Sequence, residues 1–220
     1  MHLQFRQVLI ILAMAAVLGT TAYAQGSQAR KLGPETAKSI QEATLDPAFQ
    51  TTKLDRVALL PFANTPQYKE AASIISRNFV SQLSQLHAEY KFIPPEETMN
   101  FISTASLDDQ FNVFLGDYLG SGTPRQDFLS TLRDKLQIDA VFVGKITNWG
   151  KTKVIRTLLG RPYEATTYLV GMQMSLYRTT DGRCIWSGKD LIDAQKENQL
   201  QQAAQVISNV FARFFGRTPY

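Results

Sequence analysis

Acid–base and nucleophilic chemistry depends on particular side chains, and this chain of 220 residues has few of them. His2 lies in a segment that we expect to be removed, so His87 is the one imidazole left. A zinc site needs three or four convergent ligands, and a Ser/His/Asp or Cys/His nucleophile needs its histidine. We expect His87 to face solvent at a helix end, and the single Cys184 has no partner in the chain. The sequence therefore predicts no catalytic residue, no metal site and no cofactor.

Two pairs of adjacent acidic residues and one glycine-rich loop are the remaining candidates for catalysis or ligand binding. Glu96-Glu97 and Asp108-Asp109 fall in the first turns of predicted helices, where carboxylates complement the helix dipole. Gly120-Ser121-Gly122 precedes a helix, as phosphate-binding loops do. However, it follows a helix rather than a strand and lacks the Gly-Lys-Ser/Thr ending of a P-loop. We interpret all three as structural, which argues against an enzyme.

The first 24 residues have the pattern of a secretory signal peptide. Arg6 supplies the positive charge, residues 8–18 are apolar, and Ala22-Tyr23-Ala24 is a small-x-small cleavage pattern. The apolar run is shorter than the roughly 20 residues that span a bilayer, although a retained interfacial or membrane segment is the alternative. Gln25 stands where a lipoprotein has its cysteine. We expect an exported periplasmic protein that is not lipidated, with outer-membrane association left open.

Residues 25–54 and the overall charge give less information. The segment is polar, interrupted by glycine and proline, and predicts a flexible N-terminal tether or plain disorder. The formal net charge is only +4, so cationic and anionic residues are too nearly balanced to indicate a nucleic-acid-binding protein.

Periodicity from residue 55 onward predicts one folded domain, residues 55–217. Apolar runs and alternation with a period of two indicate strands, and stripes with a period near four indicate helices. The expected strands cover residues 57–62, 90–93, 140–147, 166–176 and 184–192, and the expected helices begin near residues 64, 96, 107, 123 and 200. The fold class is α/β: a mixed, largely antiparallel sheet of about five strands packed with four to five helices.

The segment between the third and fourth strands, residues 148–164, is unusually long for a hairpin connection. It mixes cations with apolar side chains, which suits contact with a protein partner or an anionic membrane surface. The alternative is that the strands continue and that Val154, Ile155 and Leu158 fold back on the core. The candidate partner-binding residues are Trp149, Lys151, Lys153, Arg156, Arg161 and Tyr163.

Three segments carry a family resemblance over about residues 55–216. They are the opening strand 56–62, the strand 139–146 that follows a helix, and the hairpin at 181–188 with Asp181-Gly182 and Ile185-Trp186-Ser187-Gly188. Together they resemble the bacterial envelope proteins typified by CsgG, the penicillin-binding-protein activator LpoB and the TolB amino-terminal domain. The resemblance implies a non-enzymatic α/β domain that binds another envelope protein or assembles into a complex.

The predicted function is thus an exported periplasmic interaction domain that regulates or scaffolds a cell-envelope assembly, such as peptidoglycan synthesis or outer-membrane machinery. The alternative is an oligomeric outer-membrane secretion or export component of the CsgG type. The adjacent apolar pairs Val154-Ile155 and Leu158-Leu159 break the in-out alternation of a membrane strand, which disfavours a pore. We expect an envelope protein partner, leave self-association and peripheral membrane contact open, and expect no nucleic acid.

Overall fold

The computed structural model describes residues 29–64 and 67–217, and these form one α/β domain built on a mixed sheet. The predicted signal peptide, residues 1–24, lies outside the described residues. The strand order is β1-β7-β6-β5-β3-β4, with β2 also on β7, and β3 is parallel to β4 and β5. The strands are β1 (Arg30–Lys31), β2 (Glu42–Leu45), β3 (Arg56–Leu59), β4 (Lys91–Ile93), β5 (Ala140–Leu158), β6 (Arg161–Arg178) and β7 (Cys184–Asp193).

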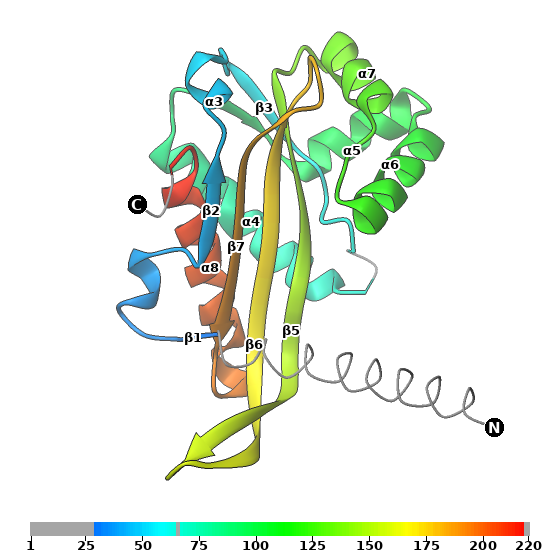
Figure 1. Ribbon diagram of the computed structural model, residues 1–220. Coiled ribbons are helices and arrows are strands. Elements are labelled where there is room, and N and C mark those ends of the chain that lie inside the picture. The colour runs from blue at the N-terminus through cyan, green and yellow to red at the C-terminus, as the bar shows by residue number, and fades with distance from the viewer. Residues whose placement is uncertain (1–28, 65–66, 218–220) are drawn as a thin grey trace, which may run out of the picture.

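Helices pack on both faces of the sheet, with α4 and α8 behind it in Figure 1 and α5, α6 and α7 grouped at the upper right. They are α3 (Ala48–Thr51), α4 (Lys69–Leu86), α5 (Pro95–Thr104), α6 (Asp108–Ser121), α7 (Gln126–Leu136) and α8 (Leu200–Phe214), with short 3-10 turns η2 (Thr36–Lys38) and η3 (Glu197–Gln199). The predicted fold class is confirmed. Among the described residues, no helix is long and apolar enough to cross a membrane.

Two apolar clusters, one on each face, hold these layers together. On the face covered by α4 and α8, Phe79 and Phe211 pack against Phe142 and Trp186. On the other face, Phe128 of α7 packs with Val141 of β5 and its neighbours. Successive strand residues point to opposite faces, so the continuous apolar run at the start of β5 serves both clusters.

The N-terminal segment differs from the predicted tether of residues 25–54. From Arg30 onward it lies on the domain: β1 runs parallel to the end of β7, and β2 runs antiparallel to its start. Ile40 and Leu54 are buried in the larger core cluster. The sequence did not predict β1 and β2 because short strands with few apolar residues show little periodicity. Their backbone groups find hydrogen-bond partners on the edge of β7.

The predicted helix start at Asn64 is also displaced, since α4 begins at Lys69. The Asn64 side chain instead pairs with β5: Nδ2 donates to the Ile146 carbonyl oxygen at 2.6 Å, and Oδ1 accepts from the Ile146 amide at 2.9 Å. The side-chain amide of Asn64 therefore replaces the backbone of a neighbouring strand at the edge of β5. This contact lies next to an irregularity in the β5–β6 register between Ile146 and Asn148.

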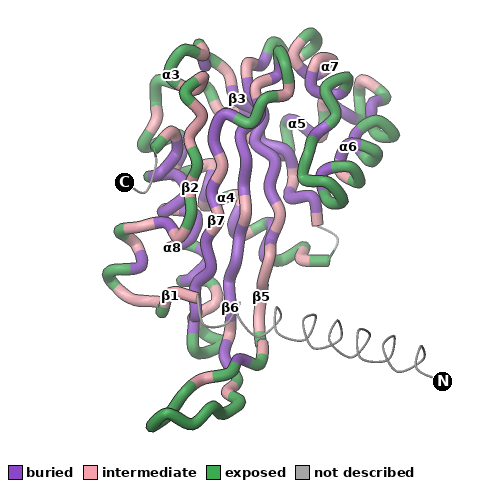
Figure 2. Tube along the Cα trace, viewed as in Figure 1, coloured by how far each residue is buried: buried purple, intermediate pink, exposed green. Residues whose placement is uncertain are grey.

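Residues 148–164 are not a connecting loop. β5 and β6 stay in register through this segment as far as Leu158 opposite Arg161, and two residues turn the chain between them. β7 pairs with β6 only between Leu169 and Tyr177, so the part beyond is a two-stranded ribbon, residues 151–168. At about 3.3 Å per residue it projects roughly 25 Å. Figure 1 shows it leaving the helical layers, and Figure 2 shows its end exposed.

Candidate binding site

The end of the ribbon is a tight turn formed by Leu159 and Gly160. Both have positive φ, 49° and 77°, as the two central residues of a type I′ turn do. Glycine adopts this conformation freely and asparagine tolerates it, whereas a leucine there is conformationally unfavourable. Yet Leu159 is 95% exposed and buries almost nothing in return. The turn thus presents an apolar side chain at a position where folding alone favours a different residue.

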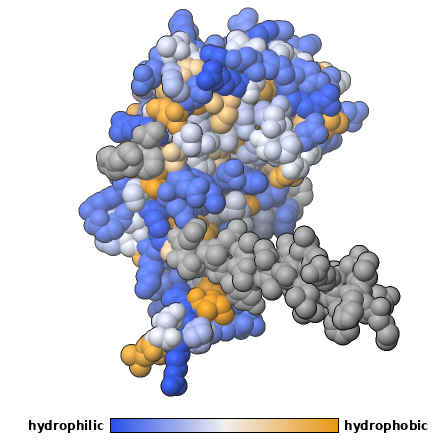
Figure 3. Space-filling model, in the orientation of Figure 1, coloured by the Kyte–Doolittle hydropathy of each residue, from blue (hydrophilic) through white to orange (hydrophobic). Residues whose placement is uncertain are grey.

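Apolar and cationic side chains surround this turn. Leu158 is 64% exposed and Tyr163 is 45% exposed, and both line a shallow hollow with Leu159, Arg161 and Pro162. Figure 3 shows apolar surface beside strongly hydrophilic surface at the projecting end. We call these five residues the hairpin tip. Of the predicted binding residues, Arg161 and Tyr163 belong to it.

Trp149 and Lys151 lie at the base of the ribbon, on the face that α4 and α8 cover higher up. Lys151 is opposite Tyr168 in the β5–β6 register, so the Trp149 and Tyr168 rings are diagonal neighbours on one face. Both rings are partly buried against the larger core cluster. Together with Lys151 they line a cavity of about 650 Å³.

Polar side chains from three other elements line the same cavity. They are Glu70 in the first turn of α4, Glu197 and Asn198 in η3, and Gln201 in α8. All four residues are exposed, as is Lys151. Among the described residues, none forms an ion pair or side-chain hydrogen bond with any of these five. We call this set, with Trp149 and Tyr168, the ribbon-base cavity.

The other two predicted binding residues are already paired. Arg156 points to the opposite face, where its Nη2 lies 2.6 Å from Asp193 Oδ2 and also donates to Thr167 Oγ1 at 3.4 Å. Asp193 is nearly buried, so this guanidinium compensates its charge. Lys153 forms an exposed ion pair with Glu164, at 2.7 Å. The six predicted residues therefore occupy separate environments rather than one surface.

Sequence reasoning missed Tyr168, Glu70, Glu197, Asn198 and Gln201. Tyr168 could have been found, because recognising Gly160 as the turn fixes the register that sets Tyr168 opposite Lys151. The others come from α4, η3 and α8, and no local pattern indicates that these elements meet β5.

His87 and Cys184, the residues first considered for catalysis, both have contacts within the domain. The prediction that His87 faces solvent is wrong: its ring packs on Tyr90 and Phe215, and Nε2 lies 2.8 Å from the Ala212 carbonyl oxygen. His87 follows the last residue of α4, and it is covered because the end of α8 and Phe215 pack against it.

Desolvation raises the pKa of the Cys184 thiol, which disfavours the nucleophilic thiolate.

The acid pairs and the glycine loop lie at the helix ends where they were predicted. Glu96-Glu97 and Asp108-Asp109 lie in the first turns of α5 and α6. Gly122 ends α6 with φ of 73°, as an ordinary helix terminator does. No group of three or more histidine, cysteine or acidic residues in the described part of the chain could hold a metal ion.

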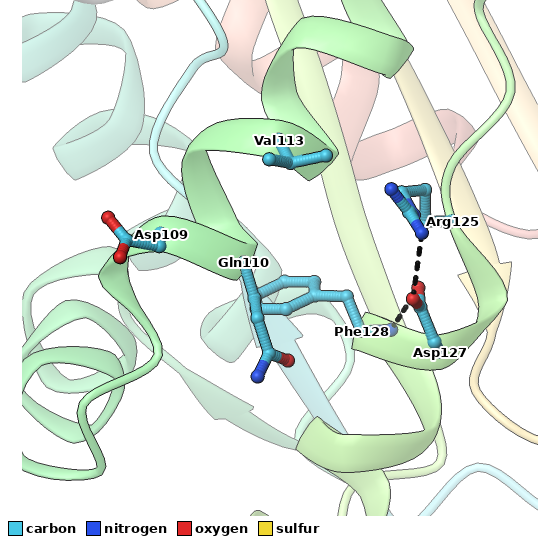
Figure 4. Close-up of a pocket in the computed structure, with 6 residues that line it drawn as sticks. All are labelled: Asp109, Gln110, Val113, Arg125, Asp127 and Phe128. Carbon is cyan, nitrogen blue, oxygen red and sulfur yellow. Dashed lines mark hydrogen bonds and ion pairs between the residues drawn. The ribbon is translucent and has the colours of Figure 1, made fainter.

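A small cavity of about 200 Å³ lies between α6 and α7 (Figure 4). Its polar side chains include Arg125 and Asp127, which pair with each other at 3.1 Å. Asp127 also accepts a hydrogen bond from the Phe128 amide at 2.8 Å and Arg125 lies 3.8 Å from Asp117. Arg125 and Asp127 are thus engaged within the domain, unlike the charged groups of the ribbon-base cavity.

No protein-family model and no curated protein matches the chain. The solved structures that the chain partly resembles include the PelC dodecamer of Paraburkholderia phytofirmans, at 16% identity and a TM-score of 0.43, covering 80% of this chain and 96% of that one. Lipoprotein GNA1162 of Neisseria meningitidis gives 16% identity and a TM-score of 0.42, over 72% of this chain and 99% of that one. Scores this low carry no conclusion about function.

Proposed function

We propose that this protein is a non-enzymatic interaction domain of the bacterial envelope, and that it docks a partner protein through the hairpin tip. The observation that carries the proposal is Leu159, which is almost fully exposed with a left-handed backbone. A conformationally costly residue with no role in packing is explained by a contact outside the chain.

The composition of the tip favours a protein as the partner. Exposed leucine, tyrosine and arginine side chains make up most of it, and tyrosine and arginine are enriched at protein interfaces. The ribbon holds these side chains away from the helical layers (Figure 1), so a partner reaches them without displacing any element of the domain.

The envelope compartment in this proposal rests on the signal-peptide pattern of residues 1–24 and on the resemblance of residues 55–216 to the CsgG, LpoB and TolB amino-terminal group. The regulation or scaffolding of an envelope assembly follows from the same resemblance.

One observation favours the second candidate, an oligomeric export component of the outer membrane. Ala63 and Asn64 cover the outer edge of β5 as far as Ile146. Farther along, no described strand pairs with the outer edge of β5, and none pairs with the outer edge of β6 beyond Leu169, so both edges of the ribbon lack a strand partner. Free strand edges pair with other chains, including a second copy.

Site-specific photocrosslinking in living cells tests the two candidates. A benzophenone amino acid replaces Leu159 in one variant and Leu86, an exposed leucine at the end of α4, in the control. The proposal expects an adduct with a different envelope protein from position 159 and none from position 86. An adduct with the same protein alone supports the oligomeric component, and the absence of any protein adduct from position 159 contradicts both.

A further inference from the structure

We infer that the ribbon-base cavity is a carbohydrate-binding site that takes a neutral or amino-bearing sugar chain. This site is separate from the hairpin tip and does not depend on docking there. The inference combines three properties of the cavity: an aromatic floor, a rim of free polar groups, and a slight excess of negative charge.

The aromatic floor suits one face of a sugar ring. Trp149 and Tyr168 lie on one face of the ribbon, and each packs against the larger core cluster and also lines the cavity. Core packing therefore fixes their orientation before a ligand arrives, which lowers the entropy lost on binding. Sugar rings present apolar C–H groups, whose positive edges are attracted to the negative face of an aromatic ring.

The polar rim suits sugar hydroxyl groups. Glu70 and Glu197 supply acceptors, Lys151 supplies donors, and the amides of Asn198 and Gln201 supply both. A sugar chain needs this mixture, since each hydroxyl group both donates and accepts. None of the five side chains has a hydrogen-bond or ion-pair partner among the described residues, so no internal contact is lost when a ligand binds.

The balance of charge selects among sugars. Two carboxylates and one ammonium group leave the rim with one net negative charge. Uronic acids and phosphorylated ligands are repelled, whereas amino groups pair with Glu70 or Glu197. The volume of about 650 Å³ lies within the roughly 300–1,000 Å³ typical of ligand pockets. Apolar peptides and lipid chains fit poorly, because free polar groups border most of this space.

Fluorescence titration tests the inference, because the chain has two tryptophans and Trp186 is buried. The probes are soluble oligomers of N-acetylglucosamine, glucosamine and galacturonic acid. We expect a saturable change in Trp149 emission with the first two and none with the acidic oligomer. The glucosamine oligomer binds more tightly, and added salt removes that advantage.

Variants separate a binding role from a structural one. Isothermal titration calorimetry measures the variants, because those at position 149 lack the fluorescent reporter. Trp149→Ala weakens binding about tenfold, the loss of roughly 1.4 kcal/mol, and Trp149→Phe restores most of it. Gln201→Ala, on an exposed helix position, weakens binding without changing the unfolding transition. Glu70→Gln with Glu197→Gln removes the preference for the amino-bearing oligomer. Tyr163→Ala, at the exposed hairpin tip, is the matched aromatic control and leaves affinity unchanged.

The inference is overturned if the wild type binds neither the neutral nor the amino-bearing oligomer, or if Trp149→Ala and Gln201→Ala bind as the wild type does. It is also overturned if anionic phospholipid vesicles, and no saccharide, change the Trp149 emission. Failed crosslinking from position 159 with intact saccharide binding contradicts only the proposed function, and the converse result contradicts only this site.

Discussion

Arg30 and Asp190 form a salt bridge that joins the first described strand to the buried part of β7. Arg30 Nε donates to Asp190 Oδ1 at 3.0 Å, and Asp190 is fully buried. The same guanidinium donates to the Thr36 carbonyl oxygen and to Ser39 Oγ, both at 2.9 Å. One side chain thus closes the loop after β1 and holds the N-terminal segment on the sheet edge.

Arg30→Ala is expected to destabilise the fold by about 3 kcal/mol near neutral pH, because it leaves a buried carboxylate without its cation. Lys38→Ala, which breaks the exposed ion pair with Glu35, is the control and changes stability by less than about 0.5 kcal/mol. Urea unfolding measures both. Equal losses for the two variants would show that Asp190 does not need Arg30.

The deficit of Arg30→Ala should also depend on pH. Desolvation raises the pKa of Asp190 above its ordinary value of 3.8, and Arg30 opposes that rise. A raised native pKa means that protonation favours the fold: this contribution is complete below 3.8 and is lost as the pH rises through the native pKa. Removing Arg30 raises the pKa further, so the deficit shrinks in mild acid. A deficit that grows on acidification would contradict this assignment.

Leu159→Asn should make the ribbon more stable while it removes the apolar tip. Asparagine tolerates the left-handed turn, so the gain is about 1 kcal/mol, measured as slower amide hydrogen exchange in residues 151–158. Leu86→Asn, on α4, leaves that exchange unchanged. Faster exchange in Leu159→Asn would mean that Leu159 stabilises the turn, and the argument for a docking role would fail.

Arg156 and Lys153 should respond differently to replacement, although both were predicted as binding residues. Arg156→Ala leaves the nearly buried Asp193 uncompensated, which costs about 2–3 kcal/mol of stability. Lys153→Ala breaks an exposed pair and costs less than about 0.5 kcal/mol. Chemical denaturation of the two variants measures both losses in stability. If Arg156→Ala unfolds as the wild type does, Asp193 does not need this cation, and Arg156 is again a candidate for partner binding.

Gly188 allows α8 and the N-terminal segment to approach β7. A Cβ atom there would lie 3.0 Å from Ile40 Cδ1 and 3.1 Å from both Phe211 and Trp186. We expect Gly188→Val to lower the unfolding free energy by about 1–3 kcal/mol. Gly116→Ala in α6, where nothing lies within 4 Å, should raise it by about 0.5–1 kcal/mol. Thermal unfolding of the two variants measures both changes. Equal destabilisation by both substitutions would contradict the role given to Gly188.

Local patterns predicted most of the elements correctly. The apolar stripe of α8, with Gly216 after it at φ of 69°, needs only neighbouring residues to be recognised. Helix starts were predicted less evenly. The start of α6 at Asp108 lies within one residue of the prediction, whereas α4 begins at Lys69, five residues after Asn64. At Asn64, pairing with Ile146, 82 residues away, replaced the local capping contact.

The sequence alone determined the period of each element, the class of the fold and the mixture of cations and aromatic rings in residues 148–164. Only the tertiary structure decided which of those side chains are free. Arg156 is neutralised by Asp193 of β7, whereas Lys151 lines the same cavity as Glu70 and Glu197, which belong to α4 and η3. The physical reason is that charge pairing and cavity formation depend on distances between elements far apart in the chain, while periodicity depends only on neighbouring residues.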